Sequence, residues 1–251
     1  TSSISLLGNY PNGQASSDSD PINPGNGKLT KQMRVHTGKI NGLVESKLDS
    51  NTYYFTRAST VWYNNDHIEQ VGGVYSLKDT SVKDLTGNLM EYSSLHQMNS
   101  LSSSTPLSDG ASVNCIETGL GHVFGLGPIK EFVFIGLSAG VNGANVFFCY
   151  PENNMPWRNI SSGFGEGISI NCLKYDQING ELYAGTNEGI YKINFRKLNP
   201  FSSWIKIKSI PNLPIMDLEI QHNQGILYAA SFGGGMFKAF LNGYPKLPNK
   251  Q

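Results

Sequence analysis

The chain has 251 residues, and its 19 Lys and Arg side chains are balanced by 19 Asp and Glu, so the formal net charge at pH 7 is zero. Only 15% of the residues are charged and no apolar run approaches the roughly 20 residues of a membrane helix, so we expect neither nucleic-acid binding nor membrane insertion. Hydrophobic residues at 39% suffice for a packed core, and the length suits one all-β domain.

The first 28 residues are rich in Ser, Asn, Asp, Gly and Pro, which is typical of a long loop or extension. We therefore expect residues 1–28 to be an N-terminal extension and residues 29–251 to form a single domain. Thr1 opens a polar segment without a signal peptide, but it can be a processed or cloned terminus, so a cytosolic address does not follow.

A short pattern of a β-branched residue, any residue, a small residue or Asp, and an aliphatic residue occurs four times. Its copies are Ile40–Leu43, Val113–Ile116, Ile170–Leu173 and Ile215–Leu218. In the last copy apolar residues point to both sides of the strand, which predicts burial on both faces. The innermost strand of a propeller blade meets that condition, because flanking blades cover its two sides.

Each of these strands is followed by a turn and an aromatic strand, and then by further strands. The expected second strands are Thr52–Thr56, Glu131–Leu137, Glu181–Thr186 and Ile226–Ser231. The expected third strands are Gly73–Leu77, Asn145–Tyr150, Gly189–Phe195 and Gly235–Leu241. The expected fourth strands are Val82–Leu85, Trp157–Ile160 and Trp204–Lys208, and we interpret the two tryptophans as edge-strand aromatics that cover their blades.

The segment 180–186 returns at 225–231, a period typical of a β-propeller or β-array. We therefore predict an all-β propeller. Because the first strands begin at residues 40, 113, 170 and 215, the first interval is too long for one blade. Val82–Leu85 also fits the first-strand pattern, so residues 89–104 would complete a fifth blade. Five blades is our prediction, and four with a long insertion is the alternative.

The last repeat has no fourth strand, whereas Leu29–Val35 is a strand without a blade of its own. Pairing the two would close the ring and protect both strand edges. We expect this closure.

Residues 171–191 resemble the propeller repeat of bacterial two-component-regulator sensor domains, and residues 215–240 resemble it more weakly. The matching residues are Asp176, Gly180, Leu182, Gly185, Thr186, Gly189 and Ile190, with Tyr183 where the family has Trp. The resemblance implies a propeller fold and an extracytoplasmic recognition module rather than a catalyst. A signalling role is not implied, because the chain shows no helical signalling segment.

The predicted function is therefore non-catalytic recognition of a carbohydrate or a protein, by a bacterial protein that is secreted or otherwise outside the cytoplasm. The insertion after the second strand carries Trp, Tyr, Asp and His, which suit stacking on a sugar and bonding its hydroxyls. An equally simple interpretation makes Val61–Tyr63 a packed strand. The candidate ligand residues, expected on one loop face, are Trp62, Tyr63, Asp66, His67, Asn142, Glu166, Asn187, Glu188 and Phe232.

Two other functions stay open. One is a protein-interaction scaffold, and the other is a glycoside hydrolase of five-bladed propeller type, which would need a pair of acids on inner strands. The candidate acids are Asp84, Glu117, Asp217 and Glu219. No HxH, HExxH or CxxC spacing occurs, so we expect neither a metal nor another cofactor. Cys115 and Cys172 occupy matching repeat positions, and a disulfide between them stays open.

Overall fold

The structure is a computed structural model that describes residues 40–57, 61–64, 67–70, 73–79, 81–85, 113–123, 126–138, 145–151, 157–197 and 202–244. Every regular element in these ranges is a β strand. No helix there is long and apolar enough to cross a membrane.

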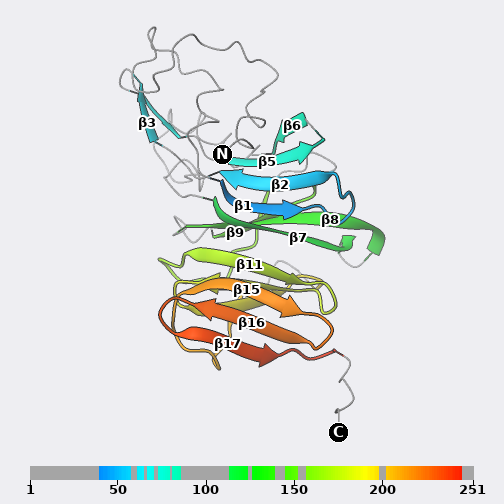
Figure 1. The fold of residues 1–251 in the computed structure, drawn as a ribbon, viewed down its shortest axis with the longest axis vertical. Helices are drawn as coiled ribbons and strands as arrows, with labels where there is room; N and C mark the ends of the chain where they lie inside the picture. Colours follow the sequence, from blue (N-terminus) through cyan, green and yellow to red (C-terminus); the bar gives the residue numbers. More distant parts are fainter. Residues whose placement is uncertain are drawn as a thin grey trace.

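The strands form four antiparallel meander sheets that lie one after another along the long axis of the molecule (Figure 1). The first sheet contains β1 (Ile40–Glu45), β2 (Thr52–Arg57), β5 (Gly73–Lys78) and β6 (Ser81–Asp84). The second contains β7 (Val113–Val123), β8 (Leu126–Leu137), β9 (Val146–Cys149) and β10 (Arg158–Asn159). The third contains β11 (Ile170–Asp176), β12 (Glu181–Thr186), β13 (Gly189–Asn194) and β14 (Ile205–Lys206), and the fourth contains β15 (Ile215–Gln221), β16 (Ile226–Ser231) and β17 (Gly235–Phe240).

These sheets are propeller blades, as the sequence predicted, and β1, β7, β11 and β15 begin at the predicted residues 40, 113, 170 and 215. The described part of the chain holds four such blades. The stretch 82–85 supplies the outer strand β6 of the first blade, so it does not begin another blade. Residues 1–28, Leu29–Val35 and residues 89–104 lie outside the described residues, so the extension, the ring closure and the fifth blade stay predictions.

The insertion after β2 folds back as a two-stranded hairpin of β3 (Val61–Asn64) and β4 (His67–Gln70). The backbone of Val61–Tyr63 therefore forms a strand, as expected in the interpretation that made this segment a strand rather than a ligand-binding loop. The hairpin forms a two-stranded sheet separate from that of the first blade.

Three hydrophobic clusters fill the spaces between successive blades. The cluster between the second and third blades is rich in rings: Phe195 contacts Phe132, Phe134 and Phe148 with centroid distances of 4.8–5.0 Å in edge-to-face geometry. Edge-to-face contact is a favourable arrangement of aromatic rings. The inner strands β7 and β11 are thus buried on both faces. The two-sided burial predicted for the last copy is wrong, because Met216, Asp217 and Glu219 of β15 are exposed.

A repeated hydrogen bond joins the inner strands across blade boundaries. Each inner strand has a register shift after its first residue, and the residue in the shift is Asn41, Asn114 or Asn171 in the first three blades. The side-chain amides of Asn41, Asn114 and Asn171 donate to the carbonyl oxygens of Val113, Ile170 and Ile215 at 2.8, 3.0 and 3.0 Å. In the last blade the equivalent residue is Met216, which has no amide to donate. In the first three blades the bulge therefore aims one amide at the next blade.

A second repeated bond joins the outer strands. The indole Nε1 of Trp157 donates to the carbonyl oxygen of Leu85 at 2.7 Å, and that of Trp204 donates to Ile160 at 2.6 Å. Both rings are buried, which supports their interpretation as covering aromatics. Each tryptophan thus links its own blade to the outer edge of the preceding blade.

Two glycines on second strands, Gly136 and Gly185, are required by close packing against the inner strands. A side chain at Gly185 would place its Cβ 2.4 Å from the sulfur of Cys172 and 2.8 Å from Ile215, and Gly136 meets Cys115 and Ile170 in the same way. Cys115, Cys149 and Cys172 are buried free thiols. No disulfide joins Cys115 and Cys172 in the structure, and burial raises the pKa of both thiols.

Candidate functional site

A row of charged residues crosses three inner strands at equivalent positions. Lys174 on β11 lies between Glu117 on β7 and Glu219 on β15, with its Nζ 4.0 Å from Glu117 Oε2 and 2.7 Å from Glu219 Oε2. Burial raises the pKa of the Glu117 carboxyl. Burial acts to lower the pKa of Lys174, but the hydrogen bond to Glu219 and the charge of Glu117 outweigh it, so the pKa is raised. The two acids are thus bridged by one ammonium group.

The other two candidate acids do not join this row. Asp217 lies on β15, and its carboxylate accepts the backbone N–H of Leu218 at 2.9 Å. Asp84 ends the outer strand β6, so its placement among inner strands was wrong. The reason is that the first-strand pattern of a β-branched residue before Asp and an aliphatic residue also fits an outer strand.

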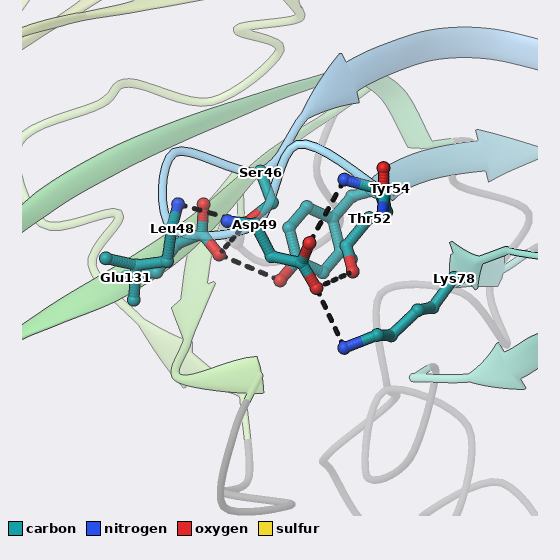
Figure 2. A network of polar contacts seen from close by, with 8 residues as sticks. Ser46, Leu48, Asp49, Thr52, Tyr54, Lys78 and Glu131 are labelled. Carbon is teal, nitrogen blue, oxygen red and sulfur yellow. Dashed lines mark hydrogen bonds and ion pairs between the residues drawn. The ribbon is translucent and has the colours of Figure 1, made fainter.

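Glu131 is a buried acid that fastens the first blade to the second (Figure 2). Its carboxylate accepts hydrogen bonds from the Ser46 hydroxyl at 2.8 Å, from the Tyr54 hydroxyl at 2.9 Å and from the backbone N–H of Lys47. Burial raises the pKa of Tyr54, and the charge of Glu131 raises it further. Asp49 beside it accepts from Thr52 and pairs with Lys78 at 2.8 Å. The carboxylate of Glu131 is thus already bonded to three donors of the protein, so its role is to hold the first blade against the second.

Asp176 is a second buried acid that joins two blades, in this case the third and the fourth. It accepts hydrogen bonds from the Tyr244 hydroxyl at 2.6 Å, from Asn179 Nδ2 at 2.7 Å and from the backbone N–H of Ile178. Tyr244 follows the last strand, so this contact ties the end of the fourth blade to the first turn of the third.

The predicted loop face is partly described. Asn187 accepts from the backbone N–H of Ser169 and donates to the carbonyl oxygen of Gly167, so its turn and the segment containing Glu166 lie together as expected. Glu188 lies 3.7 Å from Lys206, and Phe232 is exposed in the equivalent turn of the fourth blade. Trp62, Tyr63 and His67 lie in the hairpin, where the structure describes the backbone only, and Asp66 and Asn142 lie outside the described residues. Ligand binding by this face stays a prediction.

A cleft of about 340 Å³ lies at the opposite ends of the strands, between the outer parts of the third and fourth blades. Its lining residues are Asn179, Glu181, Tyr183, Lys192, Asn194, Ile207, Ser209, Leu227, Ala239, Phe240, Leu241 and Asn242. The sequence reasoning missed this site because its residues come from five separate segments.

The polar side chains of the cleft are held in place by the blade. Glu181 accepts from Lys192 at 2.8 Å and from the buried Tyr183 hydroxyl, and the Lys192 side chain is 39% exposed. The side-chain oxygen of Asn194 accepts the backbone N–H of Lys197 at 2.9 Å. Ser209 and Asn242 are exposed on the opposite walls. The cleft therefore presents an ammonium, a carboxylate, amides and a hydroxyl over an apolar floor.

Among the described residues, the tryptophan contact of the first two boundaries has no counterpart between the third and fourth blades. Ile207 follows the outer strand of the third blade as Leu85 and Ile160 follow theirs, and it lines the cleft. The fourth blade has no outer strand among the described residues, and the chain's remaining tryptophan is Trp62.

Among the described residues no group of three His, Cys, Asp or Glu side chains could hold a metal ion. No family model matches the chain, and no curated protein matches it.

Several solved structures resemble the chain. The extracellular domain of a one-component system from B. thetaiotaomicron has a TM-score of 0.46 at 13% identity over 85% of this chain, which spans 22% of that protein. YCF48 from Cyanidioschyzon merolae has a TM-score of 0.42 at 10% identity, over 83% of this chain and 84% of that protein. A GH74 enzyme from Niastella koreensis has a TM-score of 0.39 at 9% identity, over 80% of this chain and 38% of the enzyme. At these scores the likeness says nothing about a ligand or an activity.

Proposed function

We propose that this chain is a non-catalytic recognition module that binds a carbohydrate in the cleft between the third and fourth blades. The supporting observation is the lining of the cleft. Lys192, Asn194, Ser209 and Asn242 offer donors and acceptors around a volume of about 340 Å³, over a floor that includes Leu227. A small pocket with an apolar floor and a few convergent polar groups suits a ligand that has hydroxyls on an apolar ring.

The state of the carboxylates supports recognition over hydrolysis. A glycoside hydrolase needs one acid that holds a proton and a second that acts on the sugar or on water. Glu117 and Glu219 are the pair nearest to that arrangement, but Lys174 lies between them. The ammonium group of Lys174 thus pairs with Glu219 and lies beside Glu117, so neither acid is free of a partner within the protein.

The remaining parts of the proposal rest on the sequence. Export from a bacterial cell is proposed because the repeat resembles that of extracytoplasmic sensor modules. A protein ligand is the alternative to a carbohydrate, and the loop face with Trp62, Asn187 and Phe232 is the alternative site.

The proposal is tested by screening the full chain on a glycan array and titrating the best glycan by calorimetry. Lys192→Met and Asn194→Ala should each weaken binding at least tenfold, because both groups face the cleft. Lys208→Met is the matched control, since Lys208 is exposed outside the cleft and its variant should bind like wild type. No glycan binding, or binding unchanged in both cleft variants, would contradict the proposal.

The same glycan should be recovered intact after prolonged incubation. Hydrolysis by the wild type that disappears in Asp217→Asn or in Glu219→Gln would show the hydrolase instead.

A further inference from the structure

Four polar side chains of the cleft share one face of the third blade. Glu181 and Tyr183 are two residues apart on β12, and Lys192 and Asn194 are two residues apart on β13, so each pair lies on one side of its strand. Strand register places Tyr183 opposite Lys192 and Glu181 opposite Asn194. The four residues therefore form a square on the wall of the cleft, with Glu181 and Lys192 on one diagonal.

The two charged members of this square are paired with each other. The Lys192 ammonium donates to Glu181 Oε1 at 2.8 Å, and the Tyr183 hydroxyl donates to Glu181 Oε2. Both oxygens of the carboxylate thus have a donor from the protein. Glu181 and Lys192 are the acid and the base among the described residues that line the cleft, so the formal charges of this lining cancel.

Lys192 is the more accessible member of the pair. Its side chain is 39% exposed, against 19% for Glu181. An ammonium group has three N–H donors, and the bond to Glu181 uses one of them. A ligand in the cleft can therefore accept a hydrogen bond from Lys192, while the carboxylate of Glu181 is close enough to act on any charge that the ligand carries.

We propose that the cleft selects an uncharged carbohydrate and that Glu181 determines this specificity, an inference that rests on the proposed function. A ligand carboxylate bonded to Lys192 would lie near the Glu181 carboxylate, whose repulsion offsets the attraction of the ammonium. A ligand ammonium would meet Glu181 oxygens that are already bonded, and Lys192 would repel it. Neutral hydroxyls meet neither repulsion, so the pair discriminates against both kinds of charged sugar.

The two members of the pair have opposite expected effects on specificity. Glu181→Gln removes the negative charge and leaves the Lys192 ammonium without its counter-charge, so sugars that carry a carboxylate should gain affinity. Lys192→Met leaves the Glu181 carboxylate without its counter-charge, so sugars that carry an ammonium group should gain affinity. A pair that only stabilised the blade would change the affinity for neutral and charged sugars alike.

The test uses calorimetry of the full chain with oligosaccharides of glucose, galactose and mannose, each beside its uronate and its 2-amino counterpart. Wild type should bind a neutral member at least tenfold more tightly than either charged counterpart. Relative to the neutral sugar, Glu181→Gln should improve binding of the uronate at least tenfold, and Lys192→Met should do the same for the amino sugar. Glu45→Gln, at an exposed acid of the first blade outside the cleft, should keep the wild-type preference.

Two results would overturn this inference and leave carbohydrate recognition standing. One is a wild type that binds uronates or amino sugars as tightly as the neutral sugars. The other is a folded Glu181→Gln protein that keeps the neutral preference. If Glu181→Gln lowers the melting temperature too far for titration, Lys192→Met decides, and an unchanged preference in that variant overturns the inference. A wild type that binds none of these sugars would contradict the proposed function, and the inference with it.

Discussion

The side-chain amide of Asn171 donates a 3.0 Å hydrogen bond to the carbonyl oxygen of Ile215, across the boundary between the third and fourth blades. Two more such bonds, from Asn41 and Asn114, hold the earlier boundaries. The inner strands are thus linked by side chains that the bulges aim, in addition to the apolar packing between blades.

Asn171→Ala should lower the free energy of unfolding by about 1–2 kcal/mol, because the carbonyl of Ile215 would lose its partner at a packed boundary. Asn223→Ala is the control, since Asn223 is an exposed asparagine in the turn between β15 and β16. Urea unfolding of both variants checks this. Equal losses in the two would show that the amide contributes nothing.

Glu131→Gln should destabilise the first blade boundary by about 2 kcal/mol, since an amide NH₂ would then face the Ser46 and Tyr54 hydroxyls and the N–H of Lys47. Glu45→Gln, at an exposed residue of β1, is the matched change. Thermal unfolding followed by near-ultraviolet circular dichroism measures both. A Glu131→Gln protein as stable as wild type would contradict the role given to this acid.

Glu117 should make stability fall as the pH rises. Burial raises its pKa above the ordinary value of 4.5, so the folded protein binds this proton more tightly than the unfolded chain does. The contribution of Glu117 is therefore greatest below pH 4.5 and is lost as the pH rises through the raised folded pKa. Glu117→Gln should flatten this part of the profile of unfolding free energy against pH.

The pKa of Asp49 is shifted in the opposite direction from that of Glu117, so its contribution to stability depends on pH in the opposite way. Its hydrogen bond with Lys78 lowers the pKa of the Asp49 carboxyl to about 2. The contribution of Asp49 is present above its ordinary value of 3.8 and is lost as the pH falls to about 2, so Asp49→Asn should change only the acid end of the profile. Identical profiles for Glu117→Gln and wild type would refute the assignment to Glu117.

Trp62 tests the loop-face alternative. If the β3–β4 hairpin binds the ligand, Trp62→Ala should weaken binding by about 2 kcal/mol with the fold intact. If Trp62 packs within the protein, the same change should lower the free energy of unfolding by about 3–5 kcal/mol. Ligand affinity and melting temperature are measured on the one variant. No change in either would exclude both roles.

The sequence predicted the blades well because burial on both faces leaves a strong mark. Ile170 begins the inner strand β11, which is buried on both faces, and the turn glycines mark where the strands end. The strand that Ile215 begins was expected to be buried in the same way, but one of its faces is exposed. It misjudged Asp84 because a four-residue pattern cannot tell an inner strand from an outer one.

The cleft could not be predicted for a different reason. Its lining comes from side chains such as Asn194 and Asn242, which are 48 residues apart and meet only where the third blade packs against the fourth. Of the row Glu117–Lys174–Glu219, the sequence predicted the two acids as candidate site residues but did not indicate Lys174. Only the stacking of blades brings equivalent positions together.

Amide chemical-shift mapping of the isotope-labelled chain with its best array glycan tests the central claim most directly. We expect the largest changes at Asn194, Ser209 and Asn242, which line the cleft, and little change elsewhere. Changes centred instead on Asn187 and Phe232, or on Glu117 and Glu219, would contradict carbohydrate recognition in the cleft and would place the ligand on the loop face or on the inner strands.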